Sequence, residues 1–153
     1  MRSIILVLAL VVSGCVTPQP DVVTPDGGWS VDDLLRQHSI DATANIRADM
    51  IARTTGTSVH LAQIRGGETP HRHMTHDLTV TMLRGEGRGT IDGVVRSMKA
   101  GDVAVIPRGV VHFFVNTGSG VAVTLAVYSP PMDAPDTVPA VPPTDVDSPQ
   151  VPR

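Results

Sequence analysis

The sequence predicts an all-β fold whose strands close into a small β-barrel or pack as a sandwich. Short apolar runs of strand length recur between residues 46 and 128, and turns containing glycine, aspartate or proline separate most of them. Asp92-Gly93 lies between two such runs, which is the sequence pattern of a type I′ hairpin. Several short strands with regular turn signals are typical of barrels and sandwiches.

The expected elements follow one another with short connections. Residues 30–33, Ser-Val-Asp-Asp, form a capping-box pattern, so a short N-terminal helix of one or two turns is expected there, packed on the barrel. In residues 46–50, apolar side chains alternate with Arg47 and Asp49, which predicts a half-buried strand with its apolar side chains inside. Further strands are expected over 58–65, around 71–73, and over 78–83, 89–91, 94–98, 103–106, 111–115 and 121–128.

The amino terminus indicates export. Residues 4–12 form an apolar run, and Val12-Ser13-Gly14-Cys15 resembles the lipobox of bacterial lipoprotein signal peptides. About nine apolar residues are too few for a membrane-spanning helix, which needs about 20, so residues 1–14 are interpreted as a signal peptide. Cys15 is then the lipidated membrane anchor, and the alternative is a buried structural cysteine. The expected location is the bacterial cell envelope, at the outer membrane in a Gram-negative cell.

Composition divides the rest of the chain into three parts. Residues 15–28, which are rich in proline and end in Gly27-Gly28, indicate a lipid-anchored linker. Residues 29–130 hold every strand signal, and a chain of this length suffices for one domain. The proline-rich residues 131–153 are predicted to be a disordered tail.

Charge and cysteine content exclude some partners and cross-links. The formal net charge is −3 and the sequence pI is near 6.0, with no clustered lysines or arginines, so a nucleic-acid partner is not expected. Cys15 is the only cysteine, so no disulfide forms within the chain. The stability of the fold must come from packing.

Three histidines are the strongest candidates for a metal site. His71 and His73 are two apart in a predicted strand, so they share a face, and His112 lies in another strand. Converging imidazoles form a pocket for a divalent transition metal. Pro107 is expected to end the strand before His112, and Gly109 permits the positive φ of a tight turn.

Two motifs carry a family resemblance over roughly residues 45–130. Residues 101–116 read G-x5-P-x-G-x2-H-x3-N, and His71-Arg72-His73 is followed by an acidic residue and by Gly85. This pair of motifs resembles the two signatures of the cupin superfamily. The resemblance implies a small single-domain, jelly-roll-like barrel of the type-2 kind that holds one divalent metal, Fe, Mn, Zn or Ni, on His71, His73 and His112.

The fourth ligand is left open by the first motif. In the family a glutamate stands seven residues before the glycine, and Leu78 occupies that place here. Asp77 lies one residue earlier, where strand alternation turns it outward unless the strand begins late. His76 is the other candidate, and a centre of three histidines alone, with open coordination positions, is the third possibility.

The function is less constrained, because the cupin fold hosts many activities. One hypothesis is a module that binds a divalent metal and a small-molecule ligand. The alternative is a metal-dependent enzyme of the dioxygenase or isomerase type. A catalytic acid or base must reach its substrate, and the candidates are few: Glu68, Glu86 and Asp77. Homodimers are common among relatives and are a possible assembly.

Overall fold

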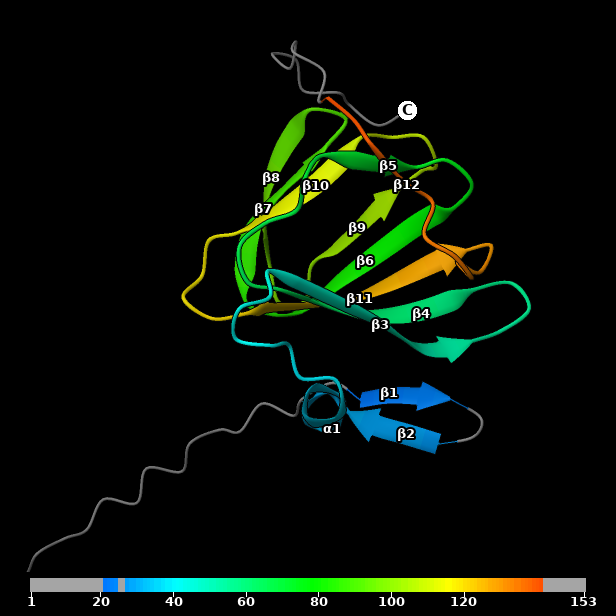
Figure 1. Ribbon diagram of the computed structural model, residues 1–153, viewed down its shortest axis with the longest axis vertical. Coiled ribbons are helices and arrows are strands. Elements are labelled where there is room, and N and C mark those ends of the chain that lie inside the picture. Colours follow the sequence, from blue (N-terminus) through cyan, green and yellow to red (C-terminus); the bar gives the residue numbers. More distant parts are fainter. Residues whose placement is uncertain (1–20, 25–26, 142–153) are drawn as a thin grey trace, which may run out of the picture.

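The computed structural model describes residues 21–24 and 27–141, and these fold into strands with one short helix (Figure 1). In chain order the elements are β1 (Asp21–Thr24), β2 (Gly27–Ser30), α1 (Val31–Gln37), β3 (Ile46–Arg53), β4 (Ser58–Ile64), β5 (His71–His73), β6 (Asp77–Arg84), β7 (Glu86–Ile91), β8 (Val94–Lys99), β9 (Val103–Ile106), β10 (His112–Asn116), β11 (Ala122–Ser129) and β12 (Thr137–Pro139).

Two five-stranded sheets form the body of the molecule. One has the strand order β12-β5-β10-β7-β8 and the other β3-β4-β11-β6-β9, and the paired strands are antiparallel. The two sheets face each other as a jelly roll (Figure 1). The predicted all-β barrel is therefore confirmed. The hairpin turn is also as predicted, since Asp92 and Gly93 both have positive φ, 49° and 75°.

The core lies between the facing sheets. Its buried side chains come from both sheets: Ile64, Met82, Phe114 and Ala122 in one cluster and Leu78, Ile106 and Ala126 in a second. Gly87 lets β7 approach this core closely, because a Cβ there would lie 2.2 Å from a ring carbon of Phe114. The apolar core thus supports the strands that carry the histidines.

A hairpin and a helix cover the outer face of the β3-containing sheet (Figure 1). The predicted short helix is confirmed as α1, whose N-cap Ser30 accepts a hydrogen bond from the Asp33 N–H at 3.1 Å. Val31 and Leu34 of the helix are buried against Leu61 and Val123 of the sheet. This helix therefore belongs to the barrel domain.

The predicted linker over residues 15–28 needs correction in its second half. Residues 21–24 pair with 27–30 as the β1-β2 hairpin. Val22 is opposite Trp29 in this hairpin, and both pack against the cluster under α1. Because these two side chains are partly removed from water, the hairpin is ordered, which the proline and glycine content of the segment does not predict.

The predicted signal peptide over residues 1–14 and Cys15 lie outside the described residues. No helix within residues 21–24 and 27–141 has the length and apolarity needed to cross a membrane.

The predicted disordered tail over residues 131–153 also needs correction. Residues 137–139 form β12, which pairs with β5 so that Thr137 is opposite His73. Asp133 forms an ion pair with Arg53 at 2.8 Å, and the Ala140 N–H donates to the Pro70 carbonyl at 3.0 Å. Proline is tolerated here because β12 is an edge strand, where an N–H can be missing. Residues 142–153 lie outside the described part of the chain.

The strand predicted over residues 46–50 is β3, and its apolar side chains line the barrel interior, but the prediction that they are buried is wrong. Ile46 and Met50 are 40% and 48% exposed, whereas Arg47 and Asp49 are partly buried. The reason is that β3 is an edge strand whose apolar residues line the open mouth of the barrel. Arg47 is shielded instead, because it bonds to Asp49 and to the Ser39 carbonyl.

Candidate metal centre

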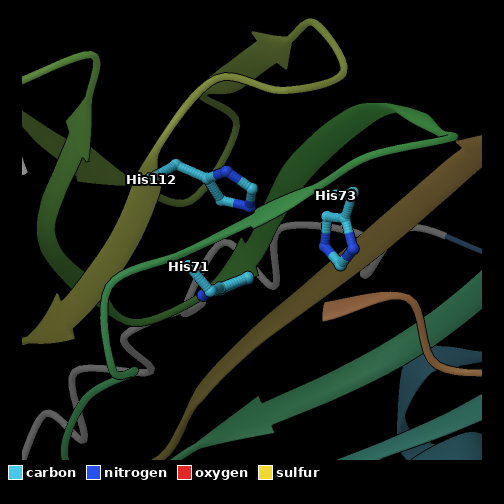
Figure 2. Close-up of side chains that lie close together, drawn as sticks. All are labelled: His71, His73 and His112. Atoms are coloured by element: carbon cyan, nitrogen blue, oxygen red, sulfur yellow. The ribbon is translucent and has the colours of Figure 1, made fainter. Parts of the chain in front are cut away.

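The structure brings together the three histidines that the motifs predict. His71 and His73 come from β5, and His112 comes from the adjacent strand β10, where it is the direct cross-strand partner of His71. Their side chains point toward a common space (Figure 2). One nitrogen from each ring lies within 4.8 Å of the other two, which is compatible with a single ion bound by all three.

The turn before β10 fixes the position of the histidine strands. Gly109 has φ +81°, a conformation that favours glycine, and its N–H donates to the His73 carbonyl at 2.7 Å. The Val110 N–H donates to the Pro107 carbonyl at 3.2 Å and closes the turn. At the other end of β10, the Asn116 amide donates to the carbonyls of Ile64 and Arg65. The second motif therefore anchors β10 at both ends.

Each histidine of the group uses Nδ1 for a contact with the surrounding protein. His71 Nδ1 bonds to the Thr69 carbonyl at 2.9 Å, and His112 Nδ1 bonds to the Val110 carbonyl at 3.0 Å. The third bond joins His73 Nδ1 to the Asp136 carboxylate at 2.7 Å. Carbonyl and carboxylate oxygens accept hydrogen bonds, so Nδ1 carries the proton in each ring. In a neutral ring Nε2 then keeps its lone pair free for a metal.

Burial keeps two of the rings neutral. It lowers the pKa of His112 to about 4 and lowers that of His73, against the opposing effect of the Asp136 carboxylate. His112 Nε2 is buried and has no hydrogen-bond partner among the described residues. A buried polar nitrogen without a partner is costly, and a metal ion would satisfy it. The donor set of three imidazoles fits a divalent transition metal and leaves coordination positions open.

The structure places neither of the two candidate fourth ligands in the three-histidine group. Asp77 faces outward, as strand alternation predicts, and forms a two-pronged ion pair with Arg108. The hydrogen bond from the Arg108 side chain lowers the pKa of Asp77 to about 2. His76 is buried beside the site, but its Nδ1 bonds to Asp136 at 2.7 Å and its Nε2 contacts the Pro131 carbonyl at 3.3 Å.

Sequence reasoning missed Asp136, which contacts both His73 and His76. No signal in the sequence identifies it, because it lies in a proline-rich segment that composition predicts to be disordered. Burial alone would raise the pKa of Asp136, but hydrogen bonds from His76, Thr75 and His73 outweigh burial and hold the pKa below its usual range. The carboxylate is therefore ionised at neutral pH.

Two cavities share lining residues at the histidines. The inner cavity, about 110 Å³, lies between the sheets, and the mouth, about 550 Å³, lies between β3 and the C-terminal segment. His112 lines the inner cavity, His73 lines the mouth and His71 lines both. A metal on the three rings would therefore stand at the junction. Both spaces are also lined by Ile46, Ala48, Glu68 and Tyr128.

Of the predicted acid–base candidates, Glu68 is the one that lines these cavities. One of its carboxylate oxygens accepts a hydrogen bond from the Phe114 N–H at 2.8 Å, which fixes it beside β10. Burial raises the pKa of Glu68, although His71 and the Phe114 hydrogen bond oppose the increase. Glu86 is exposed and lines a separate pocket, and Asp77 is on the outer surface.

Comparison with known proteins agrees with this architecture. The cupin domain family matches residues 59–128. An uncharacterized protein of Aquifex aeolicus is 37% identical over 108 residues, which cover 71% of this chain and 88% of that protein. KdgF from a Halomonas species is 25% identical with a TM-score of 0.58, over 64% of this chain and 91% of that structure. An uncharacterized Klebsiella pneumoniae protein with a double-stranded β-helix domain is 22% identical with a TM-score of 0.60, over 70% of this chain and 94% of that structure. Residues 59–128 of this chain are therefore a cupin domain, and the surrounding fold is the cupin jelly roll.

Proposed function

We propose that this protein is a lipid-anchored cupin of the bacterial cell envelope that binds one divalent transition metal and a small-molecule ligand. The observation that carries metal binding is the convergence of three histidines whose Nδ1 atoms are all occupied by protein acceptors. Three imidazole ligands leave open coordination positions, and these face a cavity. The metal would orient a ligand atom and polarise it.

The metal content of the protein tests the first part of this proposal. We expect about one equivalent of Fe, Mn, Zn or Ni per chain after purification without a histidine tag, measured by plasma emission spectrometry. Protein stripped with a chelator should bind one equivalent of added Zn²⁺ or Ni²⁺. A stripped protein that binds neither of these ions nor Fe²⁺ or Mn²⁺ would rule out the metal-binding function.

The lining of the cavities favours a compact ligand of low charge. The inner cavity is walled mainly by aliphatic side chains of both sheets, among them Ile64, Val80, Met82 and Ile106. None of the described residues that line the two cavities is a lysine or arginine. A dianionic ligand would therefore place its second charge against apolar walls without a protein counter-charge. We infer a ligand with one metal-binding group, neutral or monoanionic, and a short apolar body.

Carboxylate probes test this ligand class. In calorimetric titrations of Zn²⁺-loaded protein, butyrate should bind roughly tenfold more tightly than acetate, because each buried methylene contributes about 0.8 kcal/mol. Succinate, which adds a second charge to the same chain length, should bind no more tightly than acetate. Ala62→Leu is designed to narrow the inner cavity, so it should remove the advantage of butyrate and leave Zn²⁺ affinity unchanged. Preference for succinate over butyrate would reject the inferred ligand class.

A metal-dependent enzyme of the dioxygenase or isomerase type is the second candidate, and Glu68 is the observation that favours it. This carboxyl group lines the space into which the open coordination positions face. Its raised pKa suits a group that accepts and returns a proton. Glu68→Gln should then abolish turnover of any substrate while leaving metal affinity within a few-fold of the wild type. Turnover that survives this substitution would exclude Glu68 as the acid–base group.

A further inference from the structure

One carboxylate from the C-terminal segment joins two histidines at the mouth of the barrel. One oxygen of Asp136 accepts from His73 Nδ1 at 2.7 Å. The other accepts from His76 Nδ1 at 2.7 Å and from the N–H and hydroxyl of Thr75 at 3.1 and 2.8 Å. The His73 side chain is 4% exposed and that of Asp136 is 18% exposed. Both oxygens therefore serve as acceptors in a largely dry environment.

The backbone around Asp136 holds this carboxylate in place. Directly after it, β12 pairs with the histidine strand, with Thr137 opposite His73 and Pro139 opposite His71. Before it, Asp133 makes two hydrogen bonds to Arg53 of β3, at 2.8 and 2.9 Å. The segment is thus fixed on both sides of the barrel mouth. All of these residues except the two histidines lie outside residues 59–128, the part of the chain that matches the cupin family.

We propose that Asp136 is a positioning residue of the metal centre, which keeps the proton of His73 on Nδ1 and thereby leaves Nε2 free to bind the metal. The inference rests on the proposed metal-binding function of His73. Asp136 itself does not join the three-histidine group, so its contribution passes through the ring that it orients. Substituting a residue that hydrogen-bonds to a metal ligand in this way typically lowers metal affinity by about 10- to 100-fold.

Asparagine is the informative substitution because it keeps the shape and changes one oxygen into a donor. The Thr75 N–H can only donate, so the remaining amide oxygen is required at the position that faces Thr75 and His76. The amide NH₂ then faces His73 Nδ1, which must accept. In a neutral ring the proton moves to Nε2, the nitrogen that the metal needs.

The experiment compares the wild type with Asp136→Asn in two measurements. Long-range ¹H–¹⁵N spectra of the metal-free protein should show His73 protonated on Nδ1 in the wild type and on Nε2 in the variant. Competition with a chromophoric chelator should show that Zn²⁺ affinity falls by about 10- to 100-fold in the variant. Asp133→Asn is the matched control, since it weakens the same segment at the Arg53 ion pair without a contact to His73. It should change neither measurement.

The outcomes separate this inference from the metal-binding function itself. A wild-type His73 that carries its proton on Nε2 would overturn the role of Asp136, whatever the variant does. Loss of Zn²⁺ affinity without a change of tautomer, or an equal loss in Asp133→Asn, would show that the segment supports the fold only. A wild type that binds no metal but shows the expected tautomers would refute the proposed function and leave the orientation of His73 by Asp136 standing.

Discussion

Replacing any one of His71, His73 or His112 with alanine is expected to reduce metal affinity by more than about 100-fold. Substituting a residue that only hydrogen-bonds to a metal ligand typically lowers affinity by about 10- to 100-fold. The loss here should be larger, because each alanine variant lacks one of the three nitrogens that bind the metal. Cys15, the only cysteine of the chain, belongs to the proposed membrane anchor, so no thiol is expected to replace the lost nitrogen. The measurement is competition for Zn²⁺ with a chromophoric chelator, with far-ultraviolet circular dichroism to confirm the fold. Metal that stays bound in both His71→Ala and His112→Ala would reject the site.

Two further variants address the fourth ligand. Asp77→Ala removes a carboxylate that is paired with Arg108 on the outer surface. We therefore expect unchanged Zn²⁺ affinity. His76→Ala removes a ring that bonds to Asp136 and not to the proposed metal position, so a small loss is expected. A loss as large as that of His112→Ala in either variant would identify that residue as a fourth ligand.

Much of the fold follows from local patterns that a single sequence contains. Asp92-Gly93 specifies a hairpin because both residues adopt positive φ there. Ser30 specifies a helix start because its hydroxyl group satisfies the free N–H of Asp33. The three histidines converge because Gly109 turns the chain back onto β5, where its N–H bonds to His73. In each case a short stretch of chain determines the outcome.

The parts that sequence reasoning misses depend on contacts between distant residues. Asp136 is 63 residues from His73 in the sequence. Strand β12, which follows Asp136, forms because its backbone pairs with the edge of β5, and not because the sequence of residues 137–139 favours a strand. The β1-β2 hairpin is ordered by the burial of Trp29 and Val22 against the sheet beneath. Composition predicts neither of these two elements. The proline and glycine content of a segment bears on its conformational entropy, but it does not show whether the folded protein offers a surface on which the segment can pack.

Cys15→Ala is expected to separate the protein from the membrane without changing the metal centre. The apolar run over residues 4–12 remains and should still direct export, but the sulfur that would accept the proposed lipid is absent. Stable anchoring needs more than one acyl chain, and the variant would carry none. Fractionation and immunoblotting should find the wild type in the membrane fraction at its processed size, and the variant either at the uncleaved size or soluble in the periplasm.

Controls make this outcome specific to lipidation. Ser13→Ala keeps a small residue before the cysteine, so it should fractionate and migrate as the wild type does. The isolated Cys15→Ala protein should bind Zn²⁺ as tightly as the wild type, because the three histidines and the hydrogen-bond partners of their Nδ1 atoms all lie within residues 69–136. If Cys15→Ala partitions with membranes at the processed size, Cys15 is not the anchor. The segment over residues 1–14 would then need another interpretation, and the cell-envelope location would lose the feature on which it rests.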